Sequence, residues 1–127
     1  MRVLICDDNE DARQTMSLLV GMERHETRVC PDGASCIAVA REWRPQIGLI
    51  DIGMPGMDGY EVARQLRAEL GDAILLIAVT GFAAADDVAA AKHAGFDMHF
   101  PKANDPSALL DLVRAGASPR PTRRPTH

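Results

Sequence analysis

Short apolar runs alternate along the chain with segments whose apolar residues recur at helical spacing. The runs predict strands at Val3–Cys6, Thr27–Cys30, Ile47–Asp51, Ile74–Val79 and Met98–Phe100. The intervening segments predict helices at about Glu10–Met22, Ala34–Trp43, Tyr60–Leu70, Ala84–Ala94 and Asp105–Ala115. Strands that alternate with helices form parallel sheets covered on both faces. We therefore expect an α/β fold, a doubly wound sandwich of five strand–helix units around a five-stranded parallel sheet.

Length and composition fit one globular domain. The chain has 127 residues, enough for one core and too few for two, with 46% hydrophobic and 25% charged residues. Its apolar runs are far shorter than the roughly 18 residues of a membrane span. Charge appears at Arg2, Asp7 and Asp8, too early for a secretory signal. We expect a cytoplasmic protein that does not contact a membrane.

Charge is distributed unevenly. Residues 118–127 contain Arg120, Arg123 and Arg124 and no acidic residue, and removing these charges from the formal net charge of −4 leaves −7 for residues 1–117. An acidic body argues against direct binding of nucleic acid. We expect a folded domain at 1–117 and a disordered, basic, Pro/Arg-rich tail or linker at 118–127.

The cysteines and histidines do not form a metal-binding pattern. Cys6, Cys30 and Cys36 are odd in number, lack ligand spacing and lie in or beside apolar segments, so we expect buried, reduced thiols. The four histidines are scattered, which argues against a zinc site.

Polar residues that can bind a metal or take part in a reaction lie where the predicted strands end. They are Asp7, Asp8, Asp51, Thr80 and Lys102. In doubly wound sheets, ligands bind at the carboxyl ends of the strands. Strand ends are often polar simply because loops are exposed, but that explains poorly why acids end two apolar runs. Clustered carboxylates repel each other unless a cation lies among them. Oxygen ligands suit Mg²⁺, and an aspartate beside Mg²⁺ and a lysine can accept a phosphoryl group.

Four segments, in order, carry a family resemblance. They read LICDDNEDAR, LIDIGMPGMDGYEVARQLR, IAVTG and AGFDMHFPK. Together they resemble the receiver domains of two-component response regulators across residues 1–116. The resemblance implies the strand order 2-1-3-4-5 of the flavodoxin-like receivers. It also implies a phosphoacceptor protein that promotes only its own phosphorylation and dephosphorylation, and is otherwise not an enzyme.

The resemblance assigns roles to individual residues. Asp51 matches the phosphoacceptor and a Mg²⁺ ligand, Asp8 matches the acid that binds Mg²⁺ directly, and Asp7 matches the acid that acts through water. Gly53 would offer its backbone carbonyl to the metal. Thr80 matches the switch hydroxyl and Lys102 the lysine that pairs with the phosphoryl group.

The same resemblance implies partners. A sensor histidine kinase or phosphotransfer protein would supply the phosphoryl group. A downstream protein would bind the face formed by the predicted helix 84–94, strand 98–100 and helix 105–115, with Thr80 and His99 as the moving residues. We expect a monomer or weak dimer.

The chain departs from the family pattern in three places. His99 stands where receivers usually have Tyr or Phe, as in receivers attached to hybrid kinases. Lys102 is followed by Ala103 in place of proline; because a cis bond before alanine costs about 3–4 kcal/mol, we expect a trans Lys102–Ala103 bond, and a trans Phe100–Pro101 bond. Phe82 lies two residues beyond Thr80, where a bulky ring could slow the attack of water.

The alternatives to phosphoacceptance are a phosphate-independent adaptor, a phosphatase and a flavin- or dinucleotide-binding protein. The loss of the Lys-Pro order favours a degenerate, phosphate-independent receiver that acts as a protein-interaction adaptor. An aspartate-nucleophile phosphatase would need an Asp-x-Asp motif at the first strand, whereas Asp7 and Asp8 are adjacent. Flavin or dinucleotide binding would need a glycine-rich loop after the first strand, which is acidic here.

Overall fold

Five parallel strands form the centre of the molecule. The structure, a computed structural model, describes residues 1–54, 57–80, 85–101 and 106–117, without the side chains of residues 85–88, 106 and 117. The strands are β1 (Arg2–Cys6), β2 (Glu26–Cys30), β3 (Ile47–Asp51), β4 (Leu75–Thr80) and β5 (Met98–Pro101). They pair in the order β2-β1-β3-β4-β5, all parallel. The predicted fold class and strand order are confirmed.

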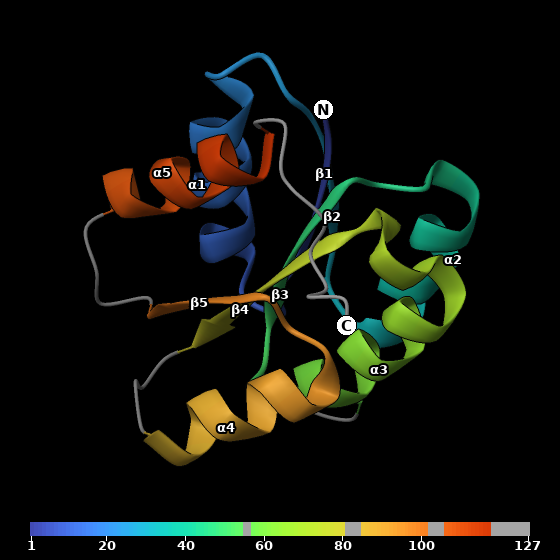
Figure 1. Cartoon of the computed structure of the whole chain (residues 1–127). Helices are drawn as coiled ribbons and strands as arrows, with labels where there is room; N and C mark the ends of the chain where they lie inside the picture. The colour runs from blue at the N-terminus through green and yellow to red at the C-terminus, as the bar shows by residue number, and fades with distance from the viewer. Residues whose placement is uncertain (55–56, 81–84, 102–105, 118–127) are drawn as a thin grey trace.

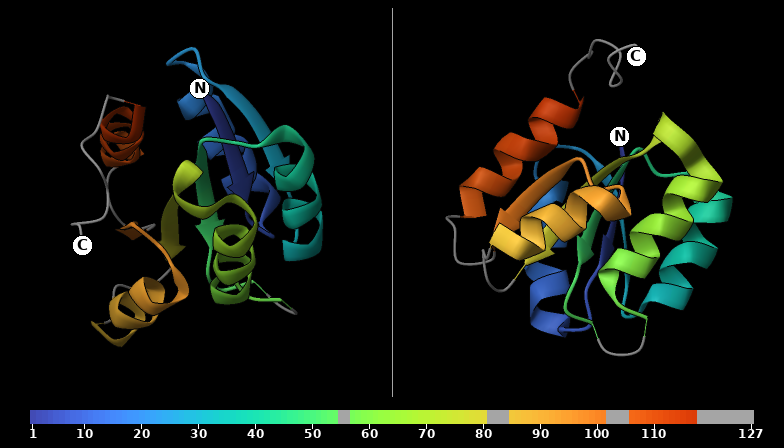
Figure 2. Two further views of the ribbon diagram at one scale, coloured as in Figure 1. Left: turned by 45° about the vertical axis from the view of Figure 1, so that its right-hand side comes forward. Right: turned by 60° about the horizontal axis from the view of Figure 1, so that its bottom comes forward.

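Helices cover both faces of this sheet. They are α1 (Glu10–Gly21), α2 (Gly33–Trp43), α3 (Gly59–Leu70), α4 (Ala85–Ala94) and α5 (Pro106–Ala117). Helices α1 and α5 lie on one side, and α2 and α3 lie on the other (Figure 1). Helix α4 packs on the same side as α2 and α3, and Figure 2 shows the two helical layers from further directions.

Alternation along the strands divides the core in two. On β4, Leu75, Ile77 and Val79 pack with residues of α1 and α5, whereas Leu76 and Ala78 pack with residues of α2, α3 and α4. All six residues of β4 are buried. Burial on both faces explains why this strand reads as a continuous apolar run.

Three helices begin at side-chain caps. The carboxamide or carboxylate oxygens of Asn9, Asp32 and Asp58 accept hydrogen bonds from the backbone N–H groups of Ala12, Ser35 and Glu61, at 2.9, 2.8 and 3.0 Å. Such caps satisfy N–H groups that have no partner within the helix. They let α1, α2 and α3 begin close to the strand ends.

The predicted elements agree with the observed ones to within one or two residues at most ends. A short 3₁₀ helix at Gly71–Ala73 was not predicted, and β4 begins at Leu75, one residue after its predicted start. The Phe100–Pro101 bond is trans, as expected. The predictions for Phe82, Lys102, the Lys102–Ala103 bond and the tail 118–127 fall outside the described residues. Within the described part of the chain, every helix is too short or too polar to cross a membrane.

Candidate functional site

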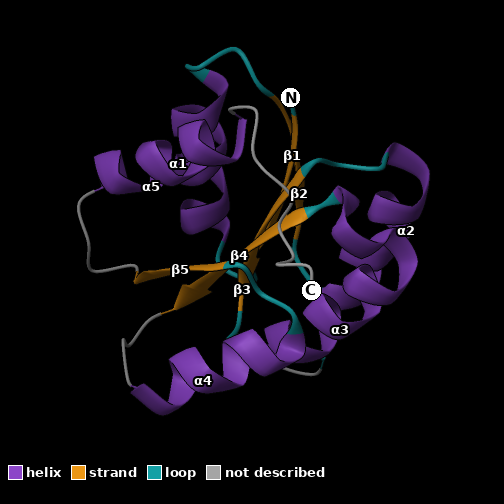
Figure 3. Cartoon of the chain, in the orientation of Figure 1, coloured by secondary structure: helices purple, strands orange, loops and turns teal. Residues whose placement is uncertain are grey.

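Three aspartates meet at the carboxyl edge of the sheet. Asp7 and Asp8 follow β1, and Asp51 is the last residue of β3, the neighbouring strand. One carboxylate oxygen from each lies within 4.8 Å of the others. The parallel arrangement of the central strands, orange in Figure 3, explains why residues 44 positions apart converge.

Asp7 is held by hydrogen bonds to its own loop, to β2 and to α1. Its side chain is fully buried, and one carboxylate oxygen accepts a hydrogen bond from the Asn9 N–H at 2.9 Å. Its backbone N–H donates to the Cys30 carbonyl at 3.1 Å, and its carbonyl accepts from the Arg13 guanidinium at 2.9 Å. Asn9 and Arg13 were not singled out from the sequence. For Asn9 the sequence offers one signal, because an asparagine directly before an amphipathic segment is a common helix cap.

Asp51 is positioned by two glycines. Its carboxylate accepts a hydrogen bond from the Gly53 N–H at 2.9 Å, and the residue is 6% exposed. Gly59, the first residue of α3, lies against the backbone of Asp51 and Ile52; a Cβ there would be 2.6 Å from the Asp51 carbonyl oxygen. Only glycine allows α3 to begin this close to Asp51.

The donor set fits a hard divalent cation. Asp7 and Asp51 are buried and Asp8 is exposed, so the cluster lies at the surface with one side open to solvent. Gathering three carboxylates is unfavourable unless a cation offsets their repulsion, and oxygen-only ligands with space for water suit Mg²⁺. Asp8, Asp51 and the Gly53 carbonyl would hold the ion, with Asp7 acting through water, and the ion would neutralise charge on a phosphoryl group.

Thr80 and His99 form a polar pair beside the cluster. Thr80 ends β4, the strand next to β3, and is 1% exposed. Its Oγ1 lies 3.0 Å from Nε2 of His99, which is half-buried on β5. The family resemblance predicted that both residues belong to a switch, but the sequence did not predict a hydrogen bond between them.

The three cysteines are buried in the core, and Cys6 directly precedes Asp7. Cys6, Cys30 and Cys36 are free and buried, as predicted. A hydrogen bond with Cys36 and burial raise the pKa of Cys6, and burial raises the pKa of Cys30 to about 11. The Cys6 thiol lies 3.6 Å from the Met54 sulfur and packs in the core next to Asp7. Neutral, enclosed thiols are poor ligands and nucleophiles.

The family of this chain follows from a comparison with known proteins. Residues 3–114 match the response regulator receiver domain. The chain belongs to this family.

Curated relatives include proteins longer than the matched region. The DNA-binding response regulator MtrA of Mycobacterium tuberculosis is 32% identical over 114 residues, which cover 90% of this chain and 49% of MtrA. An uncharacterized 14.6 kDa protein of Leptolyngbya boryana is 31% identical over 116 residues, covering 90% of this chain and 88% of that protein. The chain thus spans about half the length of the MtrA relatives that it matches.

Solved structures share the fold at low sequence identity. The beryllofluoride-activated receiver domain of Klebsiella pneumoniae RstA has a TM-score of 0.86 at 20% identity, covering 94% of this chain and all of that domain. The Vibrio cholerae chemotaxis protein CheY4 has a TM-score of 0.84 at 23% identity, covering 90% and 96%. These likenesses establish the receiver fold.

Proposed function

We propose that the chain is a phosphoacceptor in a two-component phosphorelay. Asp51 receives a phosphoryl group from a phosphohistidine on a sensor kinase or phosphotransfer protein, with Mg²⁺ at the adjacent acids. The observation that carries this proposal is the convergence of the Asp7, Asp8 and Asp51 carboxylates within 4.8 Å, with buried Thr80 at the next strand end.

Each residue has a defined role in the transfer. An Asp51 carboxylate oxygen attacks phosphorus, forming an O–P bond while the P–N bond of the donor breaks and its electron pair returns to the donor imidazole. The Gly53 N–H, 2.9 Å from one Asp51 oxygen, orients the carboxylate. The Thr80 hydroxyl donates to a phosphoryl oxygen. By family resemblance, Lys102 pairs with another phosphoryl oxygen. Such transfers rely on positioning and charge stabilisation.

The output is a change in partner binding. Thr80 lies on β4 and contacts His99 on β5. A phosphoryl group that attracts the Thr80 hydroxyl therefore also acts on β5, the strand between α4 and α5 in the chain. We assign the docking of a downstream protein to the α4–β5–α5 face. MtrA is named as DNA-binding; for this chain, with its acidic body, we propose no direct contact with nucleic acid. The expected cytoplasmic location stays a prediction.

The adaptor alternative receives less support. A receiver that no longer used phosphate would have no need for a buried Asp51 beside two further acids, and all three are present. We therefore propose that Ala103 modifies the geometry around Lys102 without removing phosphoacceptance, and that the chain turns over no separate substrate.

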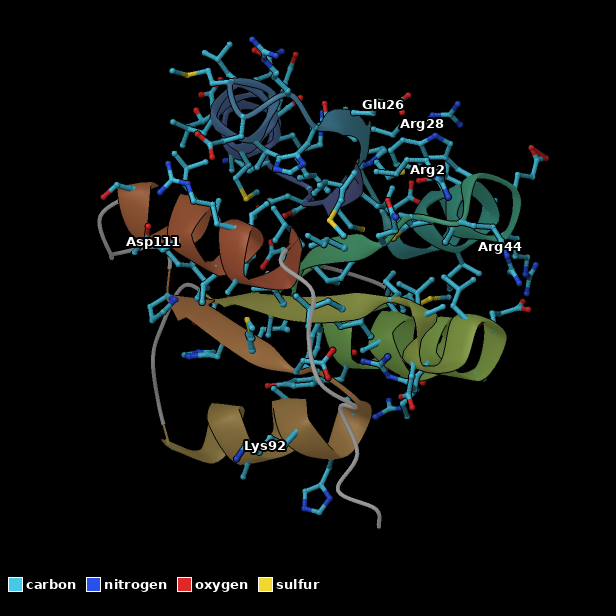
Figure 4. All side chains as sticks on the ribbon, turned by 45° about the horizontal axis from the view of Figure 1, so that its top comes forward. Arg2, Glu26, Arg28, Arg44, Lys92 and Asp111 are labelled. Atoms are coloured by element: carbon cyan, nitrogen blue, oxygen red, sulfur yellow. The ribbon has the colours of Figure 1, made fainter. Side chains whose placement is uncertain are left out.

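Phosphorylation by a small donor tests the proposal. We expect phosphoramidate with Mg²⁺ to add one phosphoryl group, seen by intact-protein mass spectrometry. Asp51→Asn should remain unmodified. Asp111→Asn, which changes an exposed acid on α5 (labelled in Figure 4), should be modified like the wild type. Equal labelling of Asp51→Asn, or labelling that survives removal of divalent ions, would contradict it.

A further inference from the structure

The hydrogen bond between Thr80 and His99 can run in either direction, depending on the tautomer of the imidazole. A hydroxyl has one proton to donate, and a neutral imidazole has one protonated and one unprotonated nitrogen. Among the described residues, His99 Nε2 is the one hydrogen-bond partner of Thr80 Oγ1, at 3.0 Å. Thr80 is 1% exposed, and a buried hydroxyl proton without an acceptor is unfavourable. The arrangement that satisfies both groups in the unmodified protein has the hydroxyl donating to Nε2 and the ring proton on Nδ1.

Phosphorylation changes this arrangement. If the Thr80 hydroxyl donates its single proton to a phosphoryl oxygen, as in the proposed function, it can no longer donate to His99. The hydroxyl oxygen still has lone pairs, so Nε2 keeps its contact only by becoming the donor. A proton on Nε2 also places positive electrostatic potential toward a site that has gained negative charge.

We propose that phosphorylation of Asp51 reverses the Thr80–His99 hydrogen bond, so that His99 Nε2–H orients the Thr80 hydroxyl toward the phosphoryl group. This inference rests on the proposed function. It makes His99 a positioning residue, with a role that a phenylalanine at this place could not perform.

The reversal reaches the α4–β5 surface. The His99 ring lines a pocket of about 130 Å³ together with Ala91, Lys92, Phe96 and Asp97. Lys92 lies on α4 (Figure 4), and Asp97 is paired with Arg67. When Nε2 is protonated in the neutral ring, Nδ1 changes from a donor to an acceptor. A partner that hydrogen-bonds to Nδ1 over this pocket would therefore meet a donor before phosphorylation and an acceptor after it.

Nitrogen NMR of the histidines tests the proposal directly. The full chain, labelled with ¹⁵N-histidine, is compared with and without beryllofluoride and Mg²⁺, at about pH 8.5, well above the ordinary imidazole pKa of about 6.5. Beryllofluoride stands in for the phosphoryl group. We expect Nε2 of His99 to change from an unprotonated to a protonated nitrogen. His93, an exposed residue of α4, should keep its signals, and His99→Gln and His93→Gln assign the resonances.

Variants supply a second readout. Glutamine carries both a donor and an acceptor, so His99→Gln should keep beryllofluoride affinity close to wild type. His99→Phe offers neither group, and its affinity should fall about 3–10-fold, the effect of one hydrogen bond. His93→Gln is the matched control and should bind like the wild type.

The outcomes separate this inference from the proposed function. A bound-fluoride signal in ¹⁹F NMR with an unchanged Nε2 of His99 would overturn the reversal while leaving phosphoacceptance intact. Equal affinities of His99→Gln and His99→Phe would also overturn it. If no bound fluoride signal appeared in the wild type, the proposed function itself would fail, and the inference with it.

Discussion

Single residues at the carboxyl edge place like charges close together. Asp7 and Asp51 are buried and lie with Asp8 inside a 4.8 Å cluster. The Asn9 and Gly53 N–H groups each donate to one of these carboxylates, which partly offsets the repulsion. We expect repulsion among the three carboxylates to lower the stability of the metal-free protein. A cation that binds only the folded state should restore it.

Mg²⁺ should therefore raise the melting temperature. At a concentration ten times the dissociation constant, mass action adds about 1.4 kcal/mol, or a few degrees for a domain of this size. Asp8→Asn should melt higher than the wild type without Mg²⁺, because one repelling charge is gone, and should lose most of the shift. Asp111→Asn is the control. A shift of equal size in Asp8→Asn would contradict the assignment of Asp8 as a ligand.

Stability should also fall in alkaline solution because of the buried thiols. Burial raises the pKa of Cys30 from 9.0 to about 11, and the pKa of Cys6 is raised too. A group whose pKa is raised by folding stabilises the folded state below its unfolded pKa and loses that contribution as the pH rises toward the folded value. The stabilisation is thus present below about pH 9 and lost between about pH 9 and 11.

Denaturant unfolding at about pH 8 and pH 10.5 measures this loss. Cys30 alone should account for about 2 kcal/mol of it. In Cys30→Ala the decrease between the two pH values should be smaller by that amount, whatever the absolute stability of the variant. An identical decrease in both proteins would show that the Cys30 thiol does not contribute.

At the scale of elements, one arginine joins three segments at the opposite edge of the sheet. The Arg67 guanidinium, at the end of α3, donates to the carbonyl oxygens of Gly71 and Ile74 at 2.6 and 2.8 Å and to that of Gly95 after α4. It also pairs with the Asp97 carboxylate at 2.9 Å. The same carboxylate accepts a hydrogen bond from the N–H of Leu76, the second residue of β4, at 2.8 Å. The network fixes α3, β4 and the turn before β5 relative to one another.

Loss of this network should be costly. The Arg67 and Asp97 side chains are only 20% and 13% exposed. Breaking such a pair removes the cation beside the Asp97 carboxylate and the side-chain donor to three backbone carbonyls. Arg67→Met should lower the free energy of unfolding by about 2–4 kcal/mol. Arg41→Met, which removes an exposed pair with Glu69, should lower it by about 0–1 kcal/mol. Similar losses in the two variants would contradict this ranking.

The elements were predictable because their patterns are local. Continuous apolar runs predicted the buried strands, and apolar residues at helical spacing predicted the helices. The 3₁₀ helix at Gly71–Ala73 was not predictable, because it carries no apolar pattern and has no buried residue. Its place depends on carbonyl contacts with Arg67, a residue of the preceding helix.

At the scale of the whole molecule, topology explains why the acidic site could be predicted. Parallel strands bring their carboxyl ends to one edge, so Asp7, Asp8 and Asp51 were expected to converge, and they do. Thr80 ends the strand next to Asp51. Contacts that depend on side-chain conformation could not be predicted in the same way. The Arg13 bond to the Asp7 carbonyl and the Thr80–His99 bond depend on rotamers that only the packed structure fixes.

The most direct test of the central claim identifies the residue that carries the phosphoryl group. Borohydride reduces an aspartyl phosphate to homoserine, so the phosphorylated position can be read by peptide sequencing. After treatment with phosphoramidate and Mg²⁺ and then borohydride, we predict homoserine at position 51 alone, and none when Mg²⁺ is omitted. Homoserine at Asp7 or Asp8 in place of Asp51, or no homoserine at any position, would contradict the account.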